Sequence, residues 1–201
     1  MENDKFYSDW GKDEIEDNYL HYTLPFLYDI TIKEGMGVLD VGGFGCGGLN
    51  TSVYLKQKGC NIDVINIDGT VKDLCDEFNV NFIEGNIFTY RDYTTTYDII
   101  LVELDSESQI KFLQEGHMDT LLQLLKPNGI LLTHFTDNLS DFPEGDYWLD
   151  RKKNLTPLVE EFTTNYCKGE PIEDVIRSSY NCYYIGKDLT RPFMKWFKIR
   201  K

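Results

Sequence analysis

Short apolar runs alternate with amphipathic segments along the middle of the chain. Each run is rich in Val, Ile or Leu and is followed by turn residues, which is typical of buried strands. The predicted strands cover residues 38–41, 62–67, 80–83, 97–102 and 130–135. Apolar residues at helical spacing between these runs predict helices over residues 49–58, 70–78 and 108–125. Strands that alternate with helices indicate an α/β fold with a doubly wound, mostly parallel sheet.

The last third of the chain shows a different pattern. A polar stretch at 136–152 contains a proline and a glycine, and a loop of this length in a compact domain is usually a lid or a binding loop. A helix is predicted over 155–166, followed by strands over 179–185 and 193–199. The short connection between these strands predicts a C-terminal antiparallel strand pair.

Two parts of the chain are distinguished in this way. Residues 1–35 predict an N-terminal helical segment that is interrupted at Pro25. Residues 36–201 predict an α/β domain. A length of 201 residues fits a single domain of this kind with a small appendage.

The first predicted strand runs directly into a glycine-rich turn. Five glycines stand among the seven residues from Gly42 to Gly48. Glycine lets the backbone approach a ligand closely, because no Cβ is in the way. A strand, a glycine-rich turn and a helix together set backbone N–H groups and a helix N-terminus against a nucleotide-like ligand. A tight turn without a ligand needs fewer glycines, so the stretch indicates a binding site of this type.

Composition narrows the classes of partner. The chain has 34 acidic and 20 basic residues, which gives a net charge of −14. A general binder of nucleic acid or of anionic membranes needs a basic face, so we expect neither partner. The last eleven residues differ, since they carry five Lys or Arg residues and no acid. Solvated surface is the simpler interpretation of that charge.

The number and spacing of the cysteines indicate the cellular compartment of the protein. Five cysteines are widely spaced and form no CxxC pair, so we expect neither a zinc site nor a disulfide framework. The sequence shows no signal peptide and no long apolar run. Both observations favour a cytoplasmic protein.

Four features stand in a fixed order along the predicted sheet. Asp40 precedes the glycine-rich turn, and Asp68 ends the second strand. Glu-Gly-Asn-Ile at 84–87 follows the third strand, and Leu-Lys-Pro-Asn-Gly at 125–129 precedes the fifth. In this order and spacing the sequence resembles the class I S-adenosylmethionine-dependent methyltransferases, over about residues 37–135. The resemblance implies a Rossmann-like fold, S-adenosylmethionine as the cofactor, and methyltransferase activity.

The resemblance also implies which residues bind the cofactor. Asp68, with Gly69 after it, would accept hydrogen bonds from the ribose hydroxyls. Asn86 and Ile87 lie in what looks like the adenine-contacting turn of the family, with Asn86 in the usual position of an Asp. Acids near the positive sulfonium and α-amino groups complete the set. The remaining implied cofactor-binding residues are Asp40, Gly42, Gly43, Gly45, Gly47 and Glu103.

Two departures from the family pattern bear on these assignments. The family places glycines two, four and six residues after the acid, where this chain has Gly42, Phe44 and Cys46. A Gly-x-Gly-x-Gly stands one residue later, so either the turn carries an extra residue or Asp40 is out of register. The fourth strand is followed by Glu-Leu-Asp at 103–105 instead of the Asn/Asp-Pro-Pro-Tyr signature of amino-methylating DNA and protein enzymes.

Catalysis of methyl transfer makes modest demands on side chains. Transfer from a sulfonium is an in-line displacement, in which the enzyme mainly holds the acceptor near attack geometry. A base is needed only if the acceptor must lose a proton. The candidates for this base are Asp105, His134 and Asp137, and we assign the role to Asp105 and His134. A strand-end histidine with a satisfied hydrogen bond is the structural alternative for His134. Asp105 with Asp137 and Asn138 also resembles the metal-binding acids of catechol-type O-methyltransferases, but the match is out of register and we assign no metal.

Three other functions stay open at the level of the sequence. The run at 97–102 followed by Asp105 and Ser106 looks like the aminopropyltransferases that make polyamines, although those carry an N-terminal β domain. The glycines at 43, 45 and 48 with Asp68 fit the dinucleotide fingerprint of NAD-binding oxidoreductases. The third is a non-catalytic domain that keeps a nucleotide fold as a binding module.

The acceptor is expected to be a small molecule, because the chain is acidic and shows no nucleic-acid-binding module. Phe142, Tyr147 and Trp148 stand among acids within 136–152, and aromatic rings among carboxylates suit a cationic or amine-bearing acceptor. We therefore expect 136–152, together with the N-terminal segment, to close over the cofactor and to form the acceptor pocket.

Overall fold

The computed structural model describes residues 27, 29–43, 50–69, 71–90, 94–136, 139–187 and 194–201. The chain divides into two compact units, Met1–Glu103 and Leu104–Lys201. The predicted N-terminal helical segment lies outside the described residues for the most part. Residues 29–36 form turns and irregular chain that lead into the first strand.

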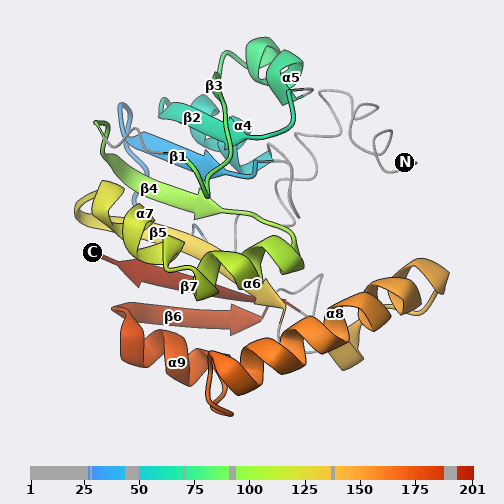
Figure 1. The fold of residues 1–201 in the computed structure, drawn as a ribbon. Coiled ribbons are helices and arrows are strands. Elements are labelled where there is room, and N and C mark those ends of the chain that lie inside the picture. The colour runs from blue at the N-terminus through green and yellow to red at the C-terminus, as the bar shows by residue number, and fades with distance from the viewer. Residues whose placement is uncertain are drawn as a thin grey trace. The chain divides into compact units, whose positions relative to one another are not determined.

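The first unit alternates strands and helices as the hydrophobic pattern predicts (Figure 1). Its strands pair in the order β3-β2-β1-β4, and each of the three pairings is parallel. Its described elements are β1 (Gly37–Val41), α4 (Asn50–Gln57), β2 (Asn61–Asn66), α5 (Val71–Glu77), β3 (Asn81–Glu84) and β4 (Tyr97–Val102).

Burial explains why the strands β1 and β4 are almost continuous apolar runs in the sequence. A parallel strand that is covered on both faces has no solvent side on which to place polar residues. Val38 and Val41 of β1 and Ile99 and Val102 of β4 are all fully buried. The strand at 97–102, the most apolar run in the sequence, pairs in parallel with β1.

The parallel arrangement also decides where polar side chains gather. The carboxyl ends of β1, β2, β3 and β4 meet at one edge, because all four strands run in the same direction. Ligands of open α/β sheets bind beyond this edge. The residues at this edge are Asp40 to Gly43, Asn66 to Gly69, Glu84 to Ile87 and Glu103.

The second unit contains three strands, paired antiparallel in the order β5-β7-β6. The predicted C-terminal antiparallel pair is therefore confirmed as β6 with β7. The described elements of this unit are α6 (Ser106–Gln114), α7 (His117–Leu124), β5 (Leu125–Thr136), a 3-10 turn (Leu139–Asp141), α8 (Asp146–Asn165), α9 (Ile172–Ser179), β6 (Cys182–Lys187) and β7 (Met194–Arg200).

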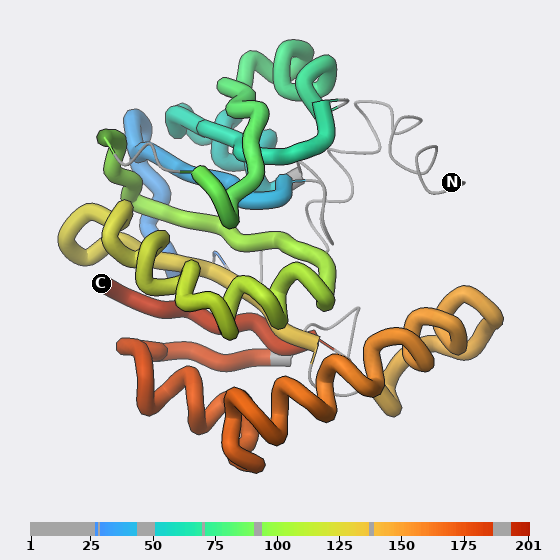
Figure 2. Tube along the Cα trace, viewed as in Figure 1, coloured from blue at the N-terminus to red at the C-terminus, as the bar shows by residue number. Residues whose placement is uncertain are grey.

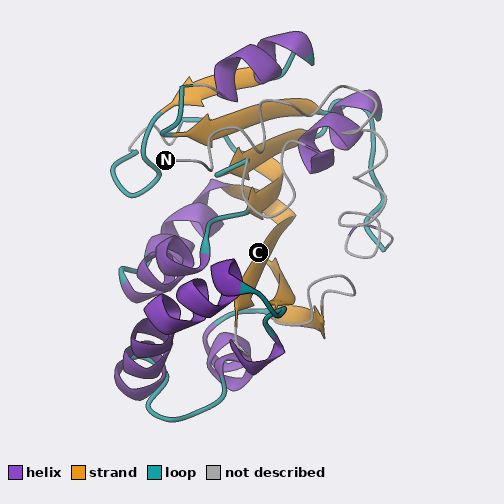
Figure 3. Cartoon of the chain, turned by 90° about the vertical axis from the view of Figure 1, so that its right-hand side faces the viewer, coloured by secondary structure: helices purple, strands orange, loops and turns teal. Residues whose placement is uncertain are grey.

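Helices α6, α8 and α9 each contact the same face of the strands of the second unit, whose helices and strands are shown in purple and orange in Figure 3. Thr133 and Phe135 of β5 point to one face, and Lys195 of β7 shares it because it pairs with Phe135. The Gln109 side chain of α6 donates to Thr133 Oγ1 at 2.9 Å, and Phe162 of α8 packs on Phe135 with the ring centroids 5.1 Å apart. Lys195 forms its ion pair with α9. Each of the three helices thus contacts one strand residue on that face of the sheet: α6 contacts Thr133, α8 contacts Phe135 and α9 contacts Lys195.

The predicted helix over 108–125 is wrong in its extent. Two helices, α6 and α7, stand there, and they are separated at Gly116, whose φ of +73° is left-handed. Glycine adopts this conformation without the steric cost that a Cβ would add. The following strand begins at Leu125, so the Lys-Pro-Asn-Gly stretch lies inside β5 rather than between helix and strand.

The polar segment before α8 is shorter than predicted. Helix α8 begins at Asp146 instead of residue 155 and runs for 20 residues, and it can be followed as one continuous orange tube in Figure 2. Its two buried residues, Leu155 and Phe162, lie at and beyond its midpoint. Before residue 155 the sequence of this helix therefore shows no apolar stripe from which a helix could be recognised.

Helix α9 was missed for a related reason. It has only eight residues, and its two buried residues, Ile172 and Ile176, are one turn apart. A single apolar pair at this spacing is too short a pattern to separate a helix from a loop. No helix in the described part of the chain is both long and apolar enough to cross a membrane.

Candidate functional site

Asp40 is the innermost polar group at the carboxyl edge of the first unit. Its side chain is fully buried, and burial raises the pKa of its carboxyl to about 7. Ser52 of α4, which is also fully buried, donates from its hydroxyl to Asp40 Oδ2 at 2.5 Å. The other oxygen, Oδ1, has no hydrogen-bond partner among the described residues. Leaving a buried carboxylate oxygen without a hydrogen-bond partner costs free energy. Such an oxygen is typical of a site in which a ligand supplies the missing donor.

The turn after β1 requires glycine at two consecutive positions. Gly42 has a φ of +82°, and its amide donates to the Ile65 carbonyl at 3.0 Å. At Gly43 an added Cβ would lie 2.9 Å from Asp40 Oδ2 and 3.0 Å from a methyl group of Val64. The backbone therefore passes directly over the buried carboxylate. Gly45 and Gly47 of the predicted site lie outside the described residues.

A second buried carboxylate stands beside the first. Glu103 directly follows β4, is almost fully buried, and its amide donates to the Val41 carbonyl at 2.9 Å. Thr51 of α4 approaches Glu103 Oε1 with its hydroxyl at 3.4 Å. Two consecutive hydroxyl residues of α4 thus contact the two buried acids. The sequence analysis missed Thr51 and Ser52, although hydroxyl residues in the first turn of the helix after the glycine-rich turn were a readable signal.

The end of β2 is open to solvent. Asp68 is exposed, and its amide is fixed by the Asn66 side chain at 3.0 Å, while Ile67 has 70% of its surface exposed. Gly69 has open space around the position of a Cβ. An exposed isoleucine beside an exposed carboxylate offers an apolar surface and a hydrogen-bond acceptor in one place. This arrangement suits a nucleoside, as the sequence predicted for Asp68 and Gly69.

The turn after β3 is tied to the same region. The Gly85 amide donates to the Asn66 carbonyl at 2.9 Å, which holds the turn against the end of β2. Asn86 accepts from the Phe88 amide through Oδ1 at 2.9 Å. Its side-chain amide group donates no hydrogen bond within the described part of the chain, so donors remain for a ligand. Ile87 is half-buried next to it.

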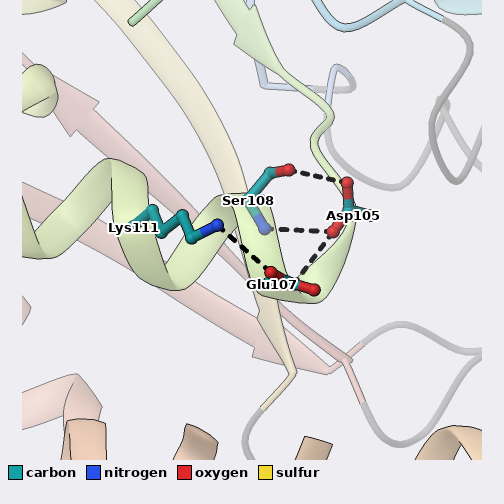
Figure 4. Close-up of polar contacts among 4 residues, drawn as sticks. All are labelled: Asp105, Glu107, Ser108 and Lys111. Atoms are coloured by element: carbon teal, nitrogen blue, oxygen red, sulfur yellow. Dashed lines mark hydrogen bonds and ion pairs between the residues drawn. The ribbon is translucent and has the colours of Figure 1, made fainter. Parts of the chain in front are cut away.

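Asp105 begins α6 in the second unit. One oxygen of its carboxylate accepts from the amides of Glu107 and Ser108 at 3.0 Å each, and the other accepts from the Ser108 hydroxyl at 2.7 Å (Figure 4). Glu107 in turn pairs with Lys111 at 3.1 Å. This is the geometry of a helix N-cap. The sequence analysis gave Asp105 a catalytic role and did not foresee the cap.

His134 lies within β5 of the same unit. It is 1% exposed and pairs across the sheet with Trp196 of β7, whose ring centroid lies 5.2 Å from that of the imidazole. The predicted candidate base is therefore an interior side chain of a strand. Asp137 and Asn138, the other residues considered with Asp105, lie outside the described residues. Within the described ranges, no three His, Cys, Asp or Glu residues are arranged to hold a metal ion.

A hollow of about 380 Å³ lies elsewhere in the first unit. It is lined by Lys56 of α4, by the beginning of β2 and by residues 79–81 at the beginning of β3. These are the amino ends of the strands, opposite to the edge that holds Asp40 and Asp68. The hollow is therefore separate from the candidate cofactor site.

No family model matches the sequence, and no curated protein matches it. Solved structures do match the fold. The N-methyltransferase NodS from Bradyrhizobium japonicum WM9 has a TM-score of 0.56 at 13% identity, covering 94% of this chain and 95% of NodS. Its complex with S-adenosyl-L-homocysteine gives 0.55 at 12% identity, covering 99% and 92%.

Two further solved structures agree with this result. The plantazolicin methyltransferase BpumL, in complex with S-adenosylhomocysteine, has a TM-score of 0.55 at 16% identity, covering 97% of this chain and 92% of BpumL. The fibrillarin pre-rRNA processing protein of Methanococcus jannaschii gives 0.51 at 13% identity, covering 84% and 67%. The chain thus has the Rossmann-like α/β fold of the class I S-adenosylmethionine-dependent methyltransferases. The fold class predicted from the sequence is confirmed.

Proposed function

We propose that this protein binds S-adenosylmethionine at the carboxyl edge of its first unit and transfers the methyl group to a small-molecule acceptor. The observation that carries the proposal is the buried Asp40, with one oxygen lacking a partner among the described residues and a turn without Cβ atoms packed over it. NodS and BpumL, which share the fold, were solved with S-adenosylhomocysteine.

The residues present fit this cofactor. Asp40 and Glu103 would face its positively charged groups, and Asp68 with Gly69 would accept from the ribose. Asn86 and Ile87 would contact the adenine, for which the Asn86 side-chain amide supplies donors. Gly42 and Gly43, with Gly45 and Gly47 of the same turn, would let the backbone approach. The bound cofactor supplies an activated methyl group, and the chain's own contribution is to orient the acceptor in line with it.

Charge supports a small-molecule acceptor over a nucleic acid. Several basic residues near the C-terminus have partners inside the second unit. Lys195 pairs with Glu173, the Arg200 guanidinium lies 4.5 Å over the Tyr183 ring, and Lys201 donates to main-chain carbonyls. These cations are largely engaged, so the C-terminal strand does not form a free basic face.

The residues around the start of α8 support a proposal for the acceptor's chemical class. Phe142 and Tyr147 each form a T-shaped contact with Trp148, with ring centroids 5.3 and 5.1 Å apart. Tyr147 is 53% exposed. Asp146 and Asp150 stand in the first two turns of α8, the helix that also carries Tyr147 and Trp148. Ring faces and carboxylates together attract cations, so an amine-bearing acceptor is proposed, with Asp105 or His134 as the base if a proton must be removed.

Calorimetric titration tests the cofactor. We expect S-adenosylhomocysteine to bind and NAD(H) to bind far more weakly. Asp68→Ala should lose a charge-assisted hydrogen bond, a cost on the order of 1.5–3 kcal/mol in binding, with little effect on folding since Asp68 is exposed. Glu77→Ala, an exposed acid at the end of α5, is the matched control and should bind as the unaltered protein does. Tight binding of NAD(H) without a response to S-adenosylhomocysteine would contradict the proposal.

A further inference from the structure

Helix α4 contacts both buried carboxylates through consecutive residues. Asp40 pairs with Leu101 across β1 and β4, and Glu103 comes two residues after Leu101. Side chains two residues apart on a strand share a face, so Asp40 and Glu103 point to the same side of the sheet. Ser52 reaches Asp40 and Thr51 reaches Glu103 from that side. The first turn of α4 is therefore packed directly on the acids at the candidate cofactor site.

The contact of Ser52 with Asp40 is one-sided. The hydroxyl donates to Oδ2 at 2.5 Å, and both side chains are fully buried. Oδ1 accepts no hydrogen bond from the described residues. The hydroxyl thus fixes the carboxylate plane through one oxygen, and the second oxygen keeps its capacity for a ligand.

The surroundings of Asp40 disfavour its charged form. Cys75 of α5 faces it as a buried thiol, whose own pKa rises to about 12 through burial first and the nearby Asp40 next. Glu103 adds a second acid on the same face, and Val64 of β2 adds an apolar wall. None of these described groups is a cation. The Ser52 hydroxyl is the described group that favours ionisation, because its hydrogen bond lowers the Asp40 pKa against the effect of burial.

We infer that Ser52 is a positioning residue of the cofactor site: its hydroxyl orients the Asp40 carboxylate and keeps it ionised, so that Oδ1 can accept from a positively charged group of the cofactor. The inference rests on the proposed function and adds Ser52, which was not among the site residues predicted from the sequence. Ser52 acts through Asp40 and need not touch the cofactor. Its effect should therefore appear in the pH dependence of binding.

The experiment measures the affinity for S-adenosylhomocysteine by calorimetry from pH 5.5 to 9. In the unaltered protein the affinity should rise with pH and level off once Asp40 is ionised. Ser52→Ala removes the hydrogen bond with little change in volume, and it should move the midpoint of this rise upward by about one pH unit. Near neutral pH the variant should bind several-fold more weakly, and at the highest pH the difference should shrink.

Cys75→Ala is the matched control. It truncates a second buried side chain that faces the same carboxylate, but it removes no hydrogen bond from Asp40. A purely structural role for Ser52 predicts that both variants lower the melting temperature and leave the midpoint where it was, and that outcome would overturn the inference. A midpoint raised in Ser52→Ala and not in Cys75→Ala supports it.

A second readout separates this inference from the proposed function. If S-adenosylhomocysteine fails to bind the unaltered protein at every pH, the proposed function fails. The Asp40 titration can then still be followed in the free protein by carboxyl carbon NMR. An upward displacement of that titration in Ser52→Ala supports the role of Ser52, and an unchanged titration refutes it.

Discussion

Asp40 shows how much a single residue can depend on its surroundings. In the sequence it is an acid before a glycine-rich turn, and in the folded chain it is a fully buried group with a pKa near 7. Its ordinary value is 3.8, so folding raises the pKa. The folded state therefore binds a proton that the unfolded state has released between these values. Stability from this group is fully present below about pH 4 and is lost as the pH rises through 7.

The prediction for this residue concerns the free energy of unfolding. Between pH 5 and pH 8 the unaltered protein should lose about 3 kcal/mol through Asp40, and Asp40→Asn should show a correspondingly flatter pH dependence. The difference between the two proteins, measured by urea unfolding at several pH values, isolates this group from the other acids. Parallel pH profiles for both proteins would show that Asp40 does not titrate in this range.

Asp105 gives a second prediction at the residue scale. Because its carboxylate caps α6, Asp105→Ala should cost about 1 kcal/mol of stability. Asp105→Asn should stay close to the unaltered protein, since Asn and Asp cap helices equally well. Thermal unfolding measures both variants. The stable Asn variant then tests the proposed catalytic role, because an acid needed as a base would reveal itself as a loss of methyl transfer without a loss of stability.

At the scale of elements, α8 is a helix of two halves. Its buried residues, Leu155 and Phe162, lie at and beyond the midpoint, and the first turn carries the exposed Tyr147 and Leu149. A helical segment with few buried contacts opens at low free-energy cost. The polar stretch interpreted from the sequence as a loop thus contains a short 3-10 turn and the start of a helix, and its aromatic residues lie around that start.

Hydrogen exchange tests whether this segment closes over a ligand. Amides from 139 to 152 should exchange rapidly in the free protein and slow when cofactor and an amine acceptor are both bound. The second half of the same helix, 155–165, is the internal control and should be protected in both states. Protection of 139–152 in the free protein, unchanged by any ligand, would move the search for the acceptor site to the N-terminal segment.

At the scale of the whole molecule, the two units divide the predicted site residues. The cofactor-binding candidates belong to the first unit, and the candidate bases Asp105 and His134 belong to the second. The net charge of −14 gives the molecule a long-range preference for cations, which favours encounter with an amine over a nucleic acid. The engaged basic side chains of β7 agree with this preference.

The sequence by itself determined the alternation of strands and helices, the parallel sheet of the first unit and the edge at which the candidate site stands. These features follow from local apolar periodicity and from turn residues, which need no knowledge of distant contacts. The turn after β1 could also be predicted from the sequence, because its conformation requires glycines. Gly42 adopts a positive φ, and the surroundings of Gly43 leave no room for a Cβ.

Only the tertiary structure decided what the polar residues do. Ser52 and Thr51 gained their roles because α4 packs on the ends of β1 and β4. Ser52 contacts Asp40 on another element, and Thr51 contacts Glu103, which is far away in the sequence. Asp105 became a cap through the helix that follows it, and His134 became an interior residue through its pairing with Trp196. The start of α8 and the whole of α9 were also decided this way, because helical segments with at most two buried residues are stabilised by what they pack against rather than by their own pattern.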